Sequence, residues 1–183
     1  EGIEVFPFGE VKFAALAKRA NYRNHRKVVV VDGRVGYVGG MNVAERYYKG
    51  VEWGRWRDTH IRIEGMAVNA LQTSFFVDWH YASRMLVDEP VYFPKVERKG
   101  DTDMQIVTSY PMGEWKTIMQ GLLQVISQSR RYLYIQTPYF MPTEPILMAL
   151  RNAALAGVDV RIMVPLRGDS LLADLASHSY YKE

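Results

Sequence analysis

A histidine, a lysine and an asparagine with the chemistry to act on a phosphate stand at fixed spacing in HRKVVVVDGRVGYVGGMN, residues 25–42. A neutral imidazole such as that of His25 is a competent nucleophile toward phosphorus. The Lys27 ammonium can hold a phosphate oxygen and offset the charge that builds up during displacement. The Asn42 amide can donate a hydrogen bond to an anionic oxygen. These three candidate catalytic residues indicate half of a phosphoryl-transfer site.

Two glycines and an aspartate in the same segment complete the candidate site. Gly39 and Gly40 have no Cβ atom, so a ligand or a second backbone can approach closely there. We expect both glycines to bind substrate together with Lys27 and Asn42. Asp32 can accept hydrogen bonds or pair with a cation, and we assign it a supporting catalytic role rather than one in bond making.

The sequence predicts a β-hairpin that positions these residues. A β-branched run, residues 26–31, is followed by an Asp-Gly dipeptide at residues 32–33 and by a second apolar run, residues 35–38. Asp-Gly favours a two-residue type I′ turn between two strands. Because side chains alternate along a strand, His25 and Lys27 should project to one face and the residue between them to the other.

The spacing HxKxxxxDxxxxxxGGxN closely resembles the HKD motif of the phospholipase D superfamily. Three further stretches, WRDTHIRIEGMAVNALQTSFFVDW, YIQTPYFMPTEPILMALRNAALAGVDVRIMVP and LASHSYY, look like the segments that join the two motifs of bacterial cardiolipin synthases. In such enzymes a second HxK strand completes the active site. Of the four histidines here only His25 begins an HxK, so we expect the second motif in a C-terminal part of a longer parent protein.

The resemblance also points to Asp58. In the superfamily an acidic residue on the strand after the GGxN turn often accepts the Nδ1 proton of the nucleophilic histidine and so fixes its tautomer. Asp58 stands where that residue is expected, and we prefer it to Glu64 for this role. The alternative is that Asp58 and His60 simply form a polar strand edge.

We expect no metal and no cofactor at this site. Ligands can be drawn from His25, His60 and Asp32, but Lys27 places a cation beside the first of them, which opposes metal binding. The chemistry of the superfamily that the chain resembles is typically metal-independent as well.

The implied function is phosphatidyl transfer in phospholipid biosynthesis. His25 would attack the phosphorus of phosphatidylglycerol and expel glycerol, and a second phosphatidylglycerol would resolve the phosphatidyl-histidine to cardiolipin. A histidine of the second motif would protonate the leaving alkoxide, so the isolated chain should be inactive. Two alternatives stay open: a single-motif homodimeric phosphodiesterase or nuclease, and a module that binds anionic lipid without turnover.

Composition limits the class of protein. Hydrophobic residues make up 48% of the chain and charged residues 23%, which is typical of a globular domain. No cysteine is present, which excludes disulfides and thiolate metal sites. The net charge of +3 weakly favours anionic partners, among which we expect anionic phospholipid rather than nucleic acid.

We expect the chain itself to be soluble, because no window of about 18 apolar residues could span a membrane. We expect its parent protein to work at the bacterial inner or cell membrane. Aromatic residues near the motif could form an acyl-chain or membrane-interface surface, although such residues are more often core or rim. They are Tyr47, Tyr48, Trp53, Trp56, Tyr139 and Phe140.

The pattern predicts an α/β fold of the phospholipase D type, with a mixed or mainly parallel sheet flanked by helices. We expect residues 1–86 to be the C-terminal part of a first half, residues 87–103 a linker, and residues 104–183 the N-terminal part of a second half. Apolar periodicity and turn signals give these elements. The strands expected outside the hairpin are Gly2–Phe8, Thr59–Ile63, Gln105–Thr108, Tyr132–Gln136 and Asp159–Val164; the helices are Met66–Ala82, Trp115–Arg130, Glu144–Ala156 and Ser170–Tyr180.

Overall fold

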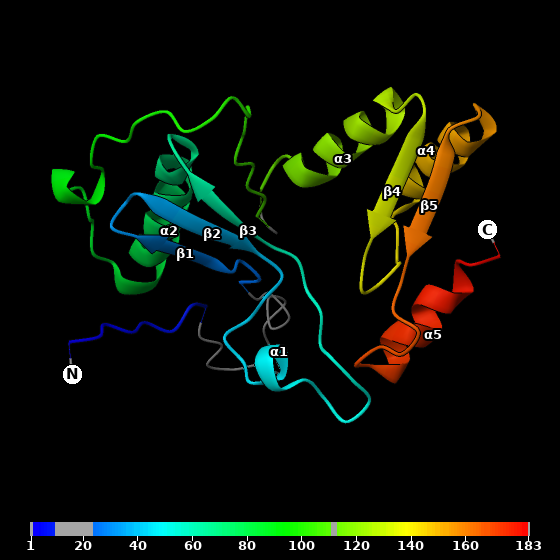
Figure 1. Cartoon of the computed structure of the whole chain (residues 1–183), viewed down its shortest axis with the longest axis horizontal. Coiled ribbons are helices and arrows are strands. Elements are labelled where there is room, and N and C mark those ends of the chain that lie inside the picture. Colours follow the sequence, from blue (N-terminus) through cyan, green and yellow to red (C-terminus); the bar gives the residue numbers. More distant parts are fainter. Residues whose placement is uncertain (1, 10–23, 111–112, 183) are drawn as a thin grey trace. The chain divides into compact units, whose positions relative to one another are not determined.

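The computed structural model of the chain describes residues 2–9, 24–110 and 113–182 (Figure 1). The chain forms two compact units, Glu1–Ile106 and Val107–Glu183, and both combine helices with strands, which confirms the α/β class. The boundary lies close to the end of the predicted linker. That the units are the end of one phospholipase D half and the start of the next stays a prediction.

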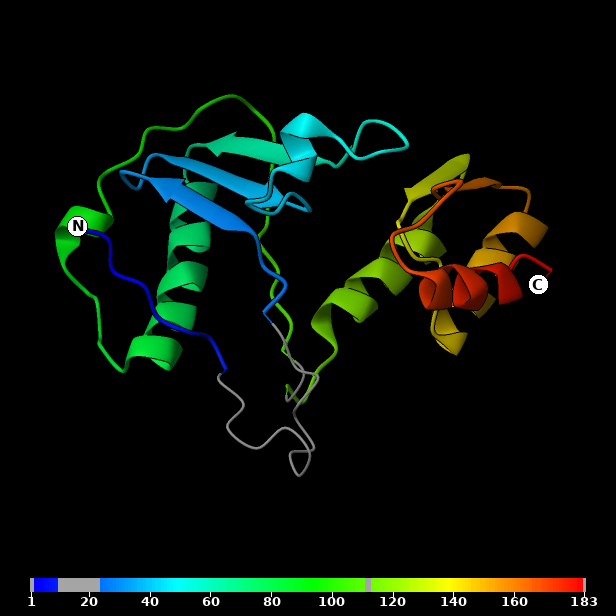
Figure 2. The same ribbon diagram turned by 90° about the horizontal axis from the view of Figure 1, so that it is seen from below.

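The first unit is built on a three-stranded antiparallel sheet in the order β1-β2-β3. Its strands are β1 (Val28–Val31), β2 (Val35–Gly39) and β3 (His60–Glu64). Helix α2 (Ala67–Ser83) covers one face of this sheet, as Figure 2 shows. Two short helices, α1 (Arg46–Lys49) and η1 (Pro90–Tyr92), lie in the connections.

The contact between α2 and the hairpin forms the core of this unit. Ile63, Val68 and Leu71 are buried, and β-branched side chains of β1 and β2 pack against them. A Cβ atom on Gly36 would lie 2.7 Å from Leu71 Cδ1, so only glycine lets the helix pack this closely on β2. Burial of this apolar surface holds the strands in place.

The hairpin turn differs from the prediction by one residue. Asp32 and Gly33 have φ values of 53° and 64°, positive at both central positions as a type I′ turn requires. However, Val31 pairs with Val35, so the connection contains three residues rather than two. This register places Val28 and Val30 opposite Val38 and Gly36. All four face α2, and a slip by one residue would turn two of them away from the core.

The second unit contains a parallel pair of strands with helices packed on it. Val158 joins residues from α3 and α4, Ile126, Leu150 and Ala153, in the core, which confirms the predicted alternation of helices and strands. The elements are α3 (Thr117–Gln128), β4 (Tyr132–Gln136), α4 (Glu144–Leu155), β5 (Asp159–Met163) and α5 (Leu171–Ser179).

Two predicted strands are wrong. Residues 2–8 and 105–108 form no strand. Ile3 is 82% exposed, whereas the Phe6 and Phe8 rings contact the Trp79 and Tyr81 rings of α2, so this segment is attached by side chains and not by strand pairing. The side chain of Ile106 packs on the buried cluster of the first unit. The segment at residues 105–108 is thus held by this apolar contact and not by hydrogen bonds to a neighbouring strand. Between the segment at residues 2–8 and the hairpin the sequence predicts only an irregular connection, residues 9–24, which lies mostly outside the described residues.

None of the helices within the described ranges is both long enough and apolar enough to cross a membrane.

Candidate active site

Most of the candidate residues meet at one end of the three-stranded sheet. His25 and Lys27 precede β1, whereas Asn42 follows β2, and antiparallel pairing brings these ends together. The segment before β3 joins them, because Gly39 pairs with His60. Just beyond β2, the Gly40 backbone N–H donates to the Thr59 carbonyl oxygen at 3.0 Å. We call this the HxK end of the sheet; it comprises residues 24–27, 39–42 and 58–60.

The glycine pair of this end lies against the segment before β3. A Cβ atom on Gly39 would stand 2.4 Å from the Thr59 carbonyl oxygen, and one on Gly40 would stand 2.2 Å from Asp58 Oδ1. The close approach expected at these glycines is therefore made by backbone and by a site carboxylate. Their role in substrate binding stays a prediction.

Asp58 is oriented by its own backbone neighbour. Its Oδ1 accepts a hydrogen bond from the Thr59 N–H at 2.7 Å, and the carboxylate stands over Gly40. Within the described residues it makes no hydrogen bond to the His25 ring. The orienting role of Asp58 therefore stays a prediction.

Lys27 is tied to the backbone of the candidate nucleophile. Its Nζ donates a hydrogen bond to the carbonyl oxygen of His25 at 2.6 Å. Lys27 is half-buried and His25 is exposed. An ammonium with one of its three donors engaged keeps two for an incoming anion, so this arrangement suits a phosphate ligand.

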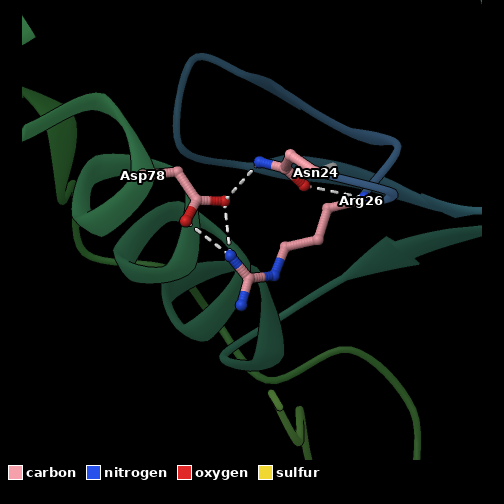
Figure 3. A network of polar contacts seen from close by, with 3 residues as sticks. All are labelled: Asn24, Arg26 and Asp78. Carbon is pink, nitrogen blue, oxygen red and sulfur yellow. Dashed lines mark hydrogen bonds and ion pairs between the residues drawn. The ribbon is translucent and has the colours of Figure 1, made fainter. Parts of the chain in front are cut away.

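A polar network that the sequence reasoning missed anchors this strand start to α2 (Figure 3). Arg26 Nη1 donates to Asp78 Oδ1 at 2.5 Å and to Oδ2 at 2.6 Å. Asn24 Nδ2 donates to the same carboxylate at 3.0 Å, and Asn24 Oδ1 accepts the Arg26 backbone N–H at 2.9 Å. Arg26 thus points toward α2. Alternation along the chain predicts that His25 and Lys27 project to the opposite face.

One signal in the sequence would have found this pair. Alternation sends Arg26 to the same side as the apolar residues of β1, and a half-buried guanidinium needs a carboxylate partner. Asp78 is the only acidic residue in the helix predicted over residues 66–82.

Asn42 is held by Tyr47, a residue expected only as part of an aromatic surface. Asn42 Nδ2 donates to Tyr47 Oη at 3.0 Å, and Tyr47 Oη donates to the Gly40 carbonyl oxygen at 3.4 Å. Burial raises the pKa of Tyr47, but hydrogen bonds from Asn42 and Arg46 and the charge of Arg46 outweigh it, so the pKa of Tyr47 lies below its ordinary value. The phenol thus fixes the direction of the amide.

Asp32 lies apart from the other candidates. It occupies the turn between β1 and β2, at the opposite end of the hairpin from His25. Its supporting catalytic role stays a prediction.

Within the described ranges, no cluster of three or more histidine or acidic side chains is arranged to hold a metal ion. The Nδ1 atom of His60 is buried beside Gly39 with no hydrogen-bond partner in the part of the chain described.

Comparison with known proteins agrees with the motif. Residues 122–183, within the second unit, match the family model described as cardiolipin synthase, PLD-like domain. The chain is 47% identical over 98% of its length to the major cardiolipin synthase ClsA of Bacillus subtilis. It is 43% identical over 98% of its length to a cardiolipin synthase of Listeria innocua, and 40% identical over its whole length to one of Geobacillus thermodenitrificans.

The chain spans 37–38% of the length of these relatives. The region of likeness to them includes the HxK end as well as the second unit. The second unit thus carries a match to a PLD-like domain, and the chain as a whole is similar to bacterial cardiolipin synthases, in agreement with the HxK motif and the α/β architecture.

Proposed function

We propose that this chain is part of a phosphatidyltransferase that joins two phosphatidylglycerol molecules into cardiolipin and releases glycerol. The observation that carries the proposal is the convergence of His25–Lys27, Asn42 and Asp58 at one end of the sheet. The relatives that share this segment are named cardiolipin synthases. The working site also needs a second HxK motif from the longer protein, at a membrane surface that supplies the lipid.

In the first step a ring nitrogen of His25 attacks the phosphorus of phosphatidylglycerol. The P–N bond forms and the P–O bond to glycerol breaks. The glycerol alkoxide takes a proton from the histidine of the second motif, which acts as general acid. The product is a phosphatidyl-histidine, and covalent catalysis thereby divides one difficult displacement into two easier ones.

In the second step a free hydroxyl of another phosphatidylglycerol attacks the same phosphorus. The P–N bond breaks, the hydroxyl proton returns to the histidine of the second motif, and cardiolipin leaves with His25 restored. Water in place of this hydroxyl would give hydrolysis, so the acceptor must be selected by contacts around the site.

Lys27 and Asn42 would bind the non-bridging phosphoryl oxygens, on which negative charge grows in both displacements. The hydrogen bonds of Lys27 to the His25 carbonyl and of Asn42 to Tyr47 support this assignment, because they leave each group with donors to spare. Asp58 would accept a hydrogen bond from the Nδ1–H of His25, which leaves Nε2 free to attack phosphorus, and would stabilise the charged ring in the intermediate.

The test uses the longer protein that carries a second HxK motif. It is incubated with phosphatidylglycerol vesicles, and cardiolipin and free glycerol are measured in parallel. We expect the two products in equal amounts, and a rapid acid quench should trap phosphatidyl-enzyme at His25. Transfer that continues in His25→Ala would contradict the proposal.

Two controls separate the alternatives. The chain of 183 residues by itself should make no cardiolipin, because the second histidine is absent from it. It should also leave a single-stranded DNA substrate intact. DNA cleavage by this chain that is lost in His25→Ala would favour the single-motif nuclease instead.

A further inference from the structure

The segment between Asn42 and Asp58 leaves the sheet at one proposed site residue and returns at another. It contains α1 and a tight turn, and in Figures 1 and 2 it is the cyan segment that extends beyond the ends of β2 and β3. We call residues 41–57 the interface loop. Because both ends of this loop lie at the HxK end, a surface that the loop contacts faces the same end of the sheet.

Large apolar and aromatic side chains of the interface loop are exposed. Val43 is fully exposed, Tyr48 is 75% exposed and Trp53 is 48% exposed. Trp53 sits in a turn closed by two backbone hydrogen bonds between Val51 and Gly54, at 2.8 and 3.0 Å. The loop therefore presents tryptophan and tyrosine side chains on an ordered backbone, and such side chains suit a boundary between water and hydrocarbon.

The charges of the same loop favour an anionic partner. Residues 43–57 contain four basic and two acidic side chains. One of the acidic residues, Glu45, pairs with Lys49 at 2.8 Å, and the Arg46 guanidinium lies 4.7 Å above the Trp56 ring. Arg55 and Arg57 are exposed beside the turn that carries Trp53, so cations flank the exposed aromatic residues.

We propose that the interface loop docks on the surface of a bilayer that contains anionic phospholipid, so that the HxK end opens toward the headgroups. The inference rests on the proposed function for the identity of the substrate. A phosphatidyl group keeps its acyl chains in the bilayer while its phosphorus reaches His25, which requires the site to stand against the headgroup layer. The exposed aromatic residues supply insertion, and the flanking cations supply attraction to the anionic surface.

The first experiment measures binding of the 183-residue chain to vesicles. Vesicles of phosphatidylcholine with phosphatidylglycerol are compared with vesicles of phosphatidylcholine alone, and brominated acyl chains quench inserted tryptophans. We expect binding to the anionic vesicles that weakens with salt, and a quenched component that disappears in Trp53→Phe. The pair Tyr48→Ser with Trp53→Ser should weaken binding about tenfold, and Arg55→Glu about fivefold or more.

Trp115→Ser is the matched control, because Trp115 is 65% exposed and lies outside the loop. It should change binding less than twofold. The proposal is overturned if the chain does not bind the anionic vesicles, or if the loop variants bind them as tightly as this control does.

The second experiment separates docking from chemistry in the longer protein. The loop pair Tyr48→Ser with Trp53→Ser is assayed on phosphatidylglycerol vesicles and on a short-chain phosphatidylglycerol below its micelle concentration. We expect about a tenfold loss on vesicles and less than a twofold loss on the monomeric lipid. Equal losses on both substrates would overturn docking. Failure of the wild type on both would reject the proposed function, and the vesicle-binding result would then decide the docking proposal independently.

Discussion

The two ends of the β1–β2 hairpin carry parts of one contiguous motif, but they differ in kind. At the HxK end, His25 is exposed and the glycine pair admits Asp58 close to the backbone. At the turn end, Gly33 is buried against Pro94, and a Cβ atom on it would lie 2.6 Å from Pro94 Cδ. We propose from this difference that the two ends of one sequence signature serve different purposes, chemistry at the first and folding at the second; the supporting catalytic role predicted for Asp32 would contradict this division.

Removing the proposed nucleophile should give the largest difference in activity between a variant at the HxK end and one at the turn end. In the longer protein, His25→Ala should lower phosphatidyl transfer by about a thousandfold or more, because no covalent intermediate can form. Asp32→Asn at the turn end should keep activity within about threefold, since asparagine tolerates the same positive φ. Initial rates on phosphatidylglycerol vesicles measure both. A loss of more than about tenfold in Asp32→Asn, with stability unchanged, would show that the turn end takes part in the chemistry.

One glycine substitution at each end should show whether that end matters more for the stability of the chain or for its activity. Gly33→Ala should destabilise the chain by about 3 kcal/mol, since the new Cβ meets Pro94 and the Tyr92 carbonyl oxygen, at 2.6 and 2.7 Å, at a positive φ. Gly40→Ala should cost about 1 kcal/mol, because the atom it meets belongs to the Asp58 side chain, which can rotate.

Urea denaturation of the 183-residue chain gives the two stabilities, and initial rates in the longer protein give the activities. Gly40→Ala should nevertheless lose more activity than its stability explains, because it displaces the proposed orienting carboxylate. If Gly40→Ala unfolds the chain more than Gly33→Ala does, the division between the two ends is wrong.

How far the sequence predicts this molecule depends on the range of each contact. Alternation and the Asp-Gly turn predict the hairpin and the side to which Arg26 points, because these are properties of neighbouring residues; the common face of His25 and Lys27 stays a prediction. The three-residue connection depends on packing against α2, which lies more than thirty residues away along the chain. The Gly40 contact with Asp58 likewise depends on the path of the chain between them.

The Arg26–Asp78 pair joins the HxK end to α2, and breaking it should have an intermediate effect. The side chains are 22% and 14% exposed, so Asp78→Ala leaves a largely buried guanidinium without its carboxylate, at a cost of about 2 kcal/mol. Because the pair fixes the strand start beside His25, we expect kcat to fall about tenfold with little change in KM.

Two variants distinguish this positioning role from a general loss of stability. Asp159→Asn removes an exposed ion pair in the second unit, with Arg161, and should leave both stability and kcat unchanged. The exchange of Arg26→Asp with Asp78→Arg should restore part of the lost kcat, because the pair is reformed in reverse. A swap that restores stability but no activity would contradict positioning.

The smallest expected effect concerns the pKa values of Tyr47 and Tyr134. It tests whether Tyr47 holds the amide of Asn42, the proposed phosphate ligand. Burial raises the pKa of Tyr47, but donation from Asn42 and Arg46 favours the phenolate more, so its pKa lies below the ordinary value. The Tyr134 phenol instead donates to the Asp159 carboxylate, which raises its pKa. A titration of tyrosine Cζ chemical shifts should therefore show Tyr47 ionising at lower pH than Tyr134.

Asn42→Ala should raise the pKa of Tyr47 and leave that of Tyr134 in place, because it removes a donor to one phenolate only. Asp159→Asn should do the reverse and lower the pKa of Tyr134 alone. If Asn42→Ala leaves the Tyr47 titration unchanged, the Asn42 amide is not bound to the phenol. Its direction at the HxK end would then be set by something other than Tyr47, and the assignment of Asn42 as a fixed phosphate ligand would lose its structural support.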